Sequence, residues 1–266
     1  MKLRNTYHES VFRRRQTVRQ KQAFQYAYCN NNPVNAVDPD GRSTYVIANA
    51  DGTYRVVGGD LDDKDYNIYA FSAGKNGELV KTSIGRSSSI TSFYNSDDGA
   101  WMTGSVINPN DNSGVNFLND IVQNNPEMGD YTTNATTGQR YDFKVTNGTG
   151  EHYSNPIDYY RGMPIGKDKD GTVIYSSARD VGNIAAGYVA GSHGVNWDKA
   201  REAFDALESQ QKGYKTIEGI STQNAQRVGW ESGWNDAQKY PIWSSYYILR
   251  DIPFDIKYFY KKLKGK

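Results

Sequence analysis

The pattern of apolar residues changes its period part-way along this chain. Between residues 43 and 105 the apolar residues form short runs, and pairs of runs flank an Asp-Gly pair at 51–52 and an Asn-Gly pair at 76–77. Glycine accepts the positive φ of a tight hairpin turn, so both places predict antiparallel strands. From Ser177 onward the apolar residues recur every three or four positions, which is the spacing of helices. These two periods predict an α+β fold, in which a small antiparallel β spacer precedes a mainly helical C-terminal half.

The C-terminal half shows helical spacing in several segments. Helices are expected over residues 113–125, from Ser177 to Gly191, from Asn196 through Leu207, from Thr222 with Ser221 as its cap, and over 243–260. Upstream of Ser177, Tyr141, Phe143 and Val145 are separated by single polar residues. Alternation of this kind is typical of a strand, because successive side chains point to opposite faces. This segment is therefore predicted to be a strand with Asp142 and Lys144 on one face.

The composition excludes several classes of protein. The only cysteine is Cys29, so neither an intramolecular disulfide nor a multi-cysteine metal site can form. No apolar run is long enough to span a membrane, and no apolar segment follows the charged N-terminus as it would in a signal peptide. The net charge of +1 indicates no general attraction to nucleic acid. We predict no bound metal and no cofactor.

A short segment near the N-terminus has an unusual order of residues. Residues 26–42 read YAYCNNNPVNAVDPDGR. This resembles the closing motif of the Rhs/YD-repeat core, in which Tyr-x-Tyr and Asn-Asn-Pro are followed by Asp-Pro-x-Gly. In that family the motif ends the conserved delivery shell, and a variable toxin follows. The resemblance implies that residues 1–42 are a remnant of the Rhs repeat-associated core, 43–105 a β-rich spacer and 106–266 a C-terminal toxin domain.

A second resemblance lies in the helix expected after Ser177. Residues 178–191 read ARDVGNIAAGYVAG and are similar to the signature helix of the type-44 polymorphic toxin domain. Residues 141–144, 197–207 and 226–229 fit the same pattern in the expected order. One departure is Ala186, where the family often has a tyrosine.

The two resemblances together imply a function. They imply the toxin of an Rhs-type polymorphic system, a secreted effector used in competition between bacteria. RNase activity is predicted for the type-44 family, so we expect a metal-independent RNase that acts in the cytoplasm of the target cell. The expected partners are a cognate immunity protein, the Rhs shell with its secretion apparatus, and RNA as a substrate.

Candidate site residues follow from this chemistry and from helical spacing. Asp180, Asn183 and Gly187 share one face of their helix, at i, i+3 and i+7. Histidine titrates near neutral pH, so His193, between two expected helices, is the candidate general base, with His152 as its alternative. The expected catalytic residues are Asp142, Lys144, Asp180 and His193, and the expected substrate-binding residues are Arg161, Arg179, Asn183 and Tyr188. The cationic side chains among them would stabilise the charge of a phosphorane.

Structural roles compete with these functional ones. Gly187 is best explained by tight helix packing, and Asp180 is explained equally well as an acid that stabilises the N-terminus of its helix. Each histidine, taken alone, is better explained as an exposed loop residue. A cell-wall hydrolase is the first alternative function, with Glu151 or Glu231 as its acid. The second is a non-enzymatic tip that only binds an immunity protein.

Overall fold

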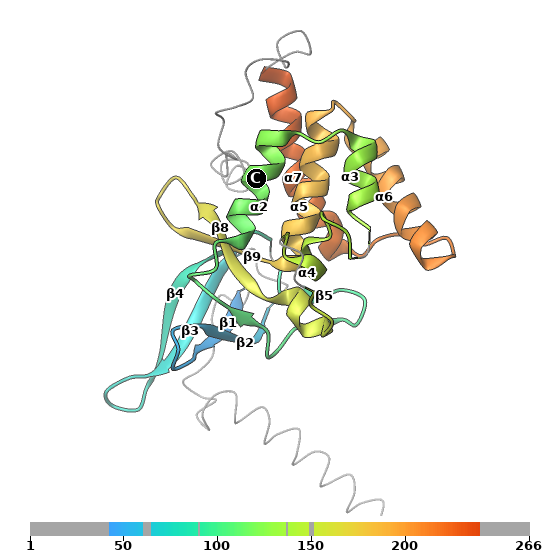
Figure 1. The fold of residues 1–266 in the computed structure, drawn as a ribbon. Helices are drawn as coiled ribbons and strands as arrows, with labels where there is room; N and C mark the ends of the chain where they lie inside the picture. Colours follow the sequence, from blue (N-terminus) through green and yellow to red (C-terminus); the bar gives the residue numbers. More distant parts are fainter. Residues whose placement is uncertain (1–42, 61–64, 90, 137, 149–151, 240–266) are drawn as a thin grey trace, which may run out of the picture. The chain divides into compact units, whose positions relative to one another are not determined.

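The computed structural model of this chain describes residues 43–60, 65–89, 91–136, 138–148 and 152–239 (Figure 1). The chain divides into two compact units, and the described part of the smaller unit is residues 71–81. The Rhs-like motif with Cys29, and the helix expected over 243–260, lie outside the described residues.

Seven strands form a closed barrel in the order β1-β2-β7-β8-β9-β4-β3. Their bounds are Thr44–Ala48 (β1), Tyr54–Gly59 (β2), Asn67–Ala73 (β3), Leu79–Ser87 (β4), Val106–Ile107 (β7), Gly162–Lys167 (β8) and Val173–Ser177 (β9). As the Asp-Gly turn predicts, β1 and β2 form an antiparallel pair. Val46, Val56, Phe93 and Ile107 are completely buried and belong to one apolar cluster. Two further strands, β5 (Tyr94–Asn95) and β6 (Ala100–Trp101), pair with each other.

The expected α+β class is confirmed, but the expected separate antiparallel spacer sheet is wrong. Strand β2 pairs with β7, and β4 runs parallel to β9, with Arg86 opposite Ile174. Strands from before and after residue 105 therefore share one barrel. A local pattern of apolar residues predicts that a strand forms, but it does not name the partner, because any strand edge offers the same backbone hydrogen-bonding groups.

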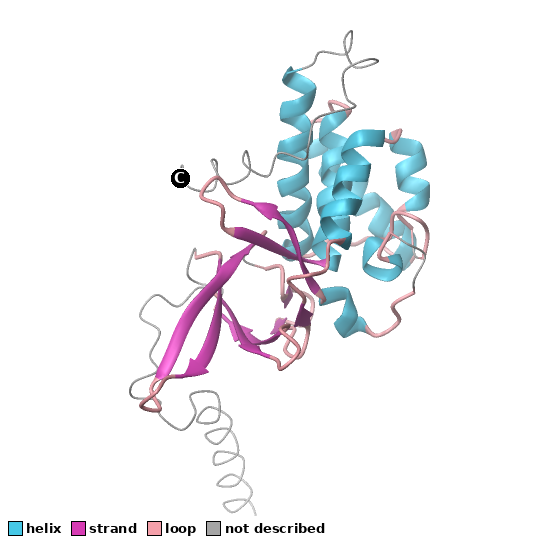
Figure 2. Cartoon of the chain, turned by 60° about the vertical axis from the view of Figure 1, so that its left-hand side comes forward, coloured by secondary structure: helices cyan, strands magenta, loops and turns pink. Residues whose placement is uncertain are grey.

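The helices group together in Figure 2, and α5 continues directly from the end of β9. Their bounds are Ser113–Asn124 (α2), Met128–Asn134 (α3), Phe143–Thr146 (α4), Ala178–Ser192 (α5), Trp197–Lys212 (α6) and Ile220–Lys239 (α7), with a 3-10 helix, η1, at Pro156–Tyr160. Ser177 caps α5 by accepting a hydrogen bond from the Asp180 N–H (3.3 Å), and Asn196 caps α6 as predicted. Helix α5 continues one residue past Gly191, and α7 begins two residues before the expected Thr222.

The strand expected at residues 141–145 is wrong, because this segment folds into α4. The backbone carbonyl of Asp142 accepts a hydrogen bond from the Thr146 N–H at 2.8 Å. Asn147 then adopts a φ of 51°, the left-handed conformation that commonly ends a helix. Five residues are too few to separate the two periods when every apolar side chain among them is buried, as it is here.

Helices α5 and α7 approach each other closely because glycines occupy the crossing. A Cβ atom on Gly187 would overlap the backbone carbonyl of Gln226, and a Cβ on Gly229 would overlap the backbone of α5 in the same way. Gly191 and Gly233 continue this close approach one turn further along. Glycine costs a helix about 1 kcal/mol relative to alanine, and backbone-to-backbone packing offsets that cost here. The packing role of Gly187 is confirmed.

Candidate functional site

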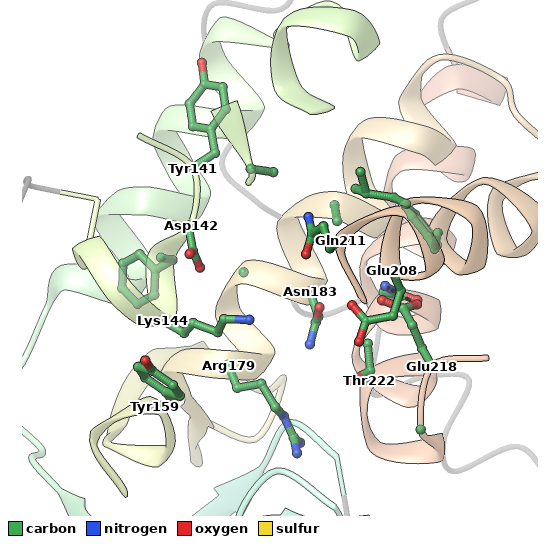
Figure 3. A pocket seen from close by; sticks show the side chains of 18 of the residues that line it. Tyr141, Asp142, Lys144, Tyr159, Arg179, Asn183, Glu208, Gln211, Glu218 and Thr222 are labelled. Carbon is green, nitrogen blue, oxygen red and sulfur yellow. Dashed lines mark hydrogen bonds between the residues drawn. The ribbon is translucent and has the colours of Figure 1, made fainter. Parts of the chain in front are cut away.

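A cavity of about 460 Å³ lies among the helices of the larger unit. This volume falls within the range of roughly 300–1,000 Å³ that is usual for small-molecule sites. Figure 3 shows side chains from α4 and α5 facing side chains from α6 and α7 across this space. Of the sequence-predicted site residues, four line the cavity: Asp142, Lys144, Arg179 and Asn183.

The wall formed by α4 presents Asp142 and Lys144. Asp142 immediately precedes α4, is 7% exposed, and accepts a hydrogen bond from the Gly138 N–H on its Oδ2 (3.0 Å). Lys144 is exposed, and its amino group turns into the cavity (Figure 3). Asp142 and Lys144 therefore both line the cavity, one just before α4 and one within it. A strand would also have placed them on one face, because they are two residues apart.

Arg161 fixes the backbone of α4 from outside the cavity. Its Nη1 donates to the carbonyl of Lys144 (2.9 Å), and its Nη2 donates to the carbonyl of Phe143 (3.1 Å) and to Oδ1 of Asn147 (3.0 Å). The guanidinium also lies over the ring of Tyr153, 3.8 Å from its centroid. The last carbonyls of a helix lack partners within the helix, and Arg161 satisfies that of Lys144, whereas the Phe143 carbonyl also accepts from the Asn147 N–H at 2.8 Å. Arg161, a predicted substrate ligand, lies outside the cavity lining and contacts the backbone of Lys144.

Arg179 lines the cavity, but the protein already uses its hydrogen-bond donors. Its Nε and Nη2 donate to Oδ1 of Asp180 at 2.8 and 2.6 Å. The remaining N–H groups donate to the carbonyls of Tyr94 and Thr91, each at 2.8 Å, and to the Tyr160 hydroxyl at 3.3 Å. A guanidinium has five N–H donors, so all five are engaged. Arg179 contributes charge to the cavity, but no uncommitted N–H group for a ligand.

Asp180 is completely buried and does not line the cavity. Burial raises the pKa of its carboxyl, while the ion pair with Arg179 opposes that shift. Its second oxygen accepts a hydrogen bond from the Ser89 hydroxyl at 3.1 Å. Asp180 thus joins the buried hydroxyl groups that connect Ser88, Ser89 and Ser92 to the end of β9 and the start of α5, and it orients Arg179.

His193 and Tyr188 both lie outside the cavity lining. His193 is the C-terminal cap of α5; its Nδ1 is 2.9 Å from the carbonyl oxygen of Val189, and its Nε2 is 3.8 Å from Glu127. Tyr188 is 2% exposed, and burial raises the pKa of its hydroxyl, which lies 3.4 Å from Asp236. The cavity therefore gathers Asp142, Lys144, Arg179 and Asn183, without Asp180, Tyr188 or the expected histidine base.

The opposite wall, from α6 and the start of α7, was missed by sequence reasoning. Its polar members are Glu208, Gln211, Lys212, Glu218, Thr222 and Gln226, with Glu218 in the loop that precedes α7. Glu218 is held by Arg201 (2.8 Å) and Gln226 (2.9 Å), and burial raises the pKa of its carboxyl despite these contacts. Glu208 pairs with Lys212 at 2.9 Å. Glu208 lies four residues after Phe204, so helical spacing places both side chains on one side of α6. The sequence of α6 does not show that this side faces α4.

Several side chains at the cavity carry polar groups that the described protein does not use, including the hydroxyls of Tyr159 and Thr222. In the described ranges, no hydrogen bond or ion pair engages the amino group of Lys144 or the amides of Asn183 and Gln211. All three lie in the cavity lining and turn toward the same space in Figure 3. Uncommitted donors and acceptors that converge on a cavity are typical of a ligand site.

Comparisons of this chain with protein-family models, with curated proteins and with solved structures found no match. Among the residues that the structure describes, no three His, Cys, Asp or Glu side chains gather as a metal site requires. None of the helices described is both long and apolar enough to cross a membrane.

Proposed function

We propose that this chain is the C-terminal tip of an Rhs-type polymorphic toxin and that its folded part cleaves RNA without a metal ion. One observation carries the proposal. The segments that resemble the type-44 toxin domain, 141–144 and 178–191, contribute Asp142, Lys144 and Asn183 to a single cavity. The Rhs-like motif at 26–42 supports the delivery context.

The roles of the cavity residues follow from the chemistry of RNA cleavage. The Asp142 carboxylate takes the proton of the 2′-hydroxyl, the 2′-oxygen attacks the phosphorus, and the 5′-oxygen leaves with a proton from water. The Lys144 ammonium lies where negative charge develops on the phosphorane, and an ion pair is stronger in a partly enclosed site than in bulk water. His193 has no role in this scheme, because it lies outside the cavity lining.

Expression of the full chain in two compartments of a bacterial host tests this function. In the cytoplasm, we expect growth arrest together with fragmented RNA. Purified protein should also cleave RNA in the presence of a chelator. Intact RNA during growth arrest would rule the RNase out. The full chain is needed, because a fragment beginning at residue 106 would lack four strands of the barrel.

A cell-wall hydrolase is the second candidate, and one observation favours it. The cavity contains the carboxylates of Glu208 and Glu218, and burial raises the pKa of Glu218 as such an acid requires. Of the acids first considered, Glu231 pairs with Arg227 at 2.9 Å, and Glu151 lies outside the described residues. Lysis that occurs only after export to the periplasm would favour this function. Toxicity in neither compartment would favour a tip that only binds an immunity protein.

A further inference from the structure

In the proposed cleavage of RNA, one role at this cavity has no residue. Asp142 takes the proton of the 2′-hydroxyl and Lys144 stabilises the phosphorane, but the departing 5′-oxygen also needs a proton, which would otherwise come from water. A positioned side chain that supplies such a proton contributes a rate factor of about 10² to 10⁴. It must line the cavity, it must be acidic, and it must not already be engaged.

Tyr159, on η1, meets these three conditions. Its side chain is half-buried and lines the cavity, and no described residue bonds to its hydroxyl. A phenol keeps its proton at neutral pH, yet it gives that proton up far more readily than water does. The hydroxyl of Thr222 is equally uncommitted, but an aliphatic hydroxyl is no better an acid than water.

The other tyrosines of the described lining are less suitable. The hydroxyl of Tyr131 donates to a backbone carbonyl at 3.3 Å, and that of Tyr160 accepts from Arg179 at 3.3 Å. The hydroxyl of Tyr141 turns away from Lys144 in Figure 3. Tyr159 is therefore the tyrosine of this lining that combines an uncommitted hydroxyl with a place near Lys144.

The remaining polar groups of the lining do not fill the role either. The amides of Asn183 and Gln211 are not acids. The carboxyls of Glu208 and Glu218 are held in ion pairs on the opposite wall, at 2.9 and 2.8 Å. Lys144 carries protons, but losing one would remove the positive charge that the phosphorane needs.

Arg161 fixes Tyr159 and Lys144 relative to each other. Its Nη1 donates to the carbonyl of Lys144 at 2.9 Å and to the carbonyl of Asp158 at 2.8 Å. Asp158 immediately precedes Tyr159, so a single nitrogen atom holds the backbones of α4 and η1 together. The two side chains therefore stand on elements that are tied to each other, as a preorganised site requires.

The order of the side chains suits an in-line displacement. In such a transition state, the attacking and leaving oxygens lie on opposite sides of the phosphorus. In the view of Figure 3, the Lys144 side chain lies between those of Asp142 and Tyr159. A phosphate at Lys144 would therefore have the base on one side and the phenol on the other.

We propose that Tyr159 is the general acid that protonates the departing 5′-oxygen, an inference that rests on the proposed RNase function. The 2′-oxygen gives its proton to Asp142 and bonds to the phosphorus. The bond from phosphorus to the 5′-oxygen breaks, and that oxygen takes the proton of Tyr159. The products are a 2′,3′-cyclic phosphate and a 5′-hydroxyl. Asp142 has gained one proton and Tyr159 has lost one, so exchange through water restores both groups.

A change of leaving group tests this role. The full-length protein and its Tyr159→Phe variant are given a 2′-O-methyl RNA hexanucleotide with a single 2′-hydroxyl, and the same molecule with sulfur in place of the bridging 5′-oxygen at that linkage. A thiol is a far stronger acid than an alcohol, so the sulfur leaves without a proton donor. We expect Tyr159→Phe to lower kcat/KM by roughly 100-fold or more on the oxygen substrate, and by less than about twofold on the sulfur substrate.

The sulfur substrate also serves as the control for folding, because a variant that cleaves it normally has an intact site. Tyr214→Phe, at an exposed position outside the cavity lining, is the matched substitution and should leave both rates unchanged.

Each other outcome overturns a distinct claim. An equal loss on both substrates would make Tyr159 a substrate ligand and overturn the acid role, and full activity on both would remove Tyr159 from the reaction. In either case the RNase function stands. If the wild type cleaves neither substrate and no natural RNA, the RNase function fails, and the acid role fails with it.

Discussion

Two sides of helix α5 are built in opposite ways. Toward α7, Gly187 and Gly191 allow the two backbones to meet, and no room remains even for a methyl group. On the cavity side, Asn183 carries an uncommitted amide, and residues of α6 that line the same cavity, such as Phe204, are only half-buried. Helix α5 therefore has two different sides. Its tight contact with α7 at Gly187 and Gly191 is called the seam below, and its cavity side at Asn183 is called the open side. Rigidity at the seam gives the site a fixed wall, which a preorganised site requires.

The largest expected effect is at the seam. Gly187→Val should destabilise the fold by about 3 kcal/mol or more, because the added carbons meet the backbone of α7, which cannot move without separating the helices. Chemical denaturation measures the change. Gly129→Ala, in α3, where a Cβ meets nothing within 4 Å, is the matched control and should be neutral or stabilising. Equal effects of the two substitutions would contradict the seam.

On the open side, the largest effect is expected at Lys144. Lys144→Ala should lower kcat/KM on RNA by roughly 100- to 1,000-fold, as for other single groups that stabilise transition-state charge, with an unchanged melting temperature because the side chain is exposed. The exposed Lys169, at the β8–β9 turn, provides the matched control Lys169→Ala. Full activity of Lys144→Ala would remove Lys144 from the mechanism.

Arg161 tests whether the open side depends on positioning. Arg161→Lys keeps the charge but loses the two-carbonyl contact with α4, so Lys144 should shift. We expect kcat to fall by roughly 10- to 100-fold, with a smaller change in KM. Arg140→Lys, whose side chain is 60% exposed, is the control. A rise in KM with kcat unchanged would instead make Arg161 a substrate ligand.

The smallest expected effect concerns the pH dependence of stability at Glu218. Burial raises its folded-state pKa, so the folded protein keeps this proton at a pH where the unfolded chain has lost it. Its contribution to stability therefore falls as pH rises from the ordinary glutamate range through the folded pKa. Glu218→Gln does not titrate, so its stability relative to the wild type should improve over that window by about 1 kcal/mol or less. Denaturation curves from about pH 4 to about pH 8 measure this; Glu202→Gln, at an exposed position, is the control.

Sequence reasoning succeeded where local periodicity was long enough. Helix α2 buries Phe117, Leu118, Ile121 and Val122, the apolar face that its spacing predicts, and Asn196 caps α6 as expected. It failed at α4, where five alternating residues are compatible with either period. It did not show that His193 lies outside the cavity lining, because the availability of a proton near neutral pH says nothing about where a side chain points.

By itself, the sequence determined the α+β class, the hairpin of β1 and β2, and the main helices, because each depends on neighbours a few residues away. The tertiary structure decided the closure of the barrel between β4 and β9, the engagement of every Arg179 donor, and the arrival of Gln211 opposite Asn183. These depend on pairs of residues far apart in the chain, and local preferences are the same whichever partner is chosen.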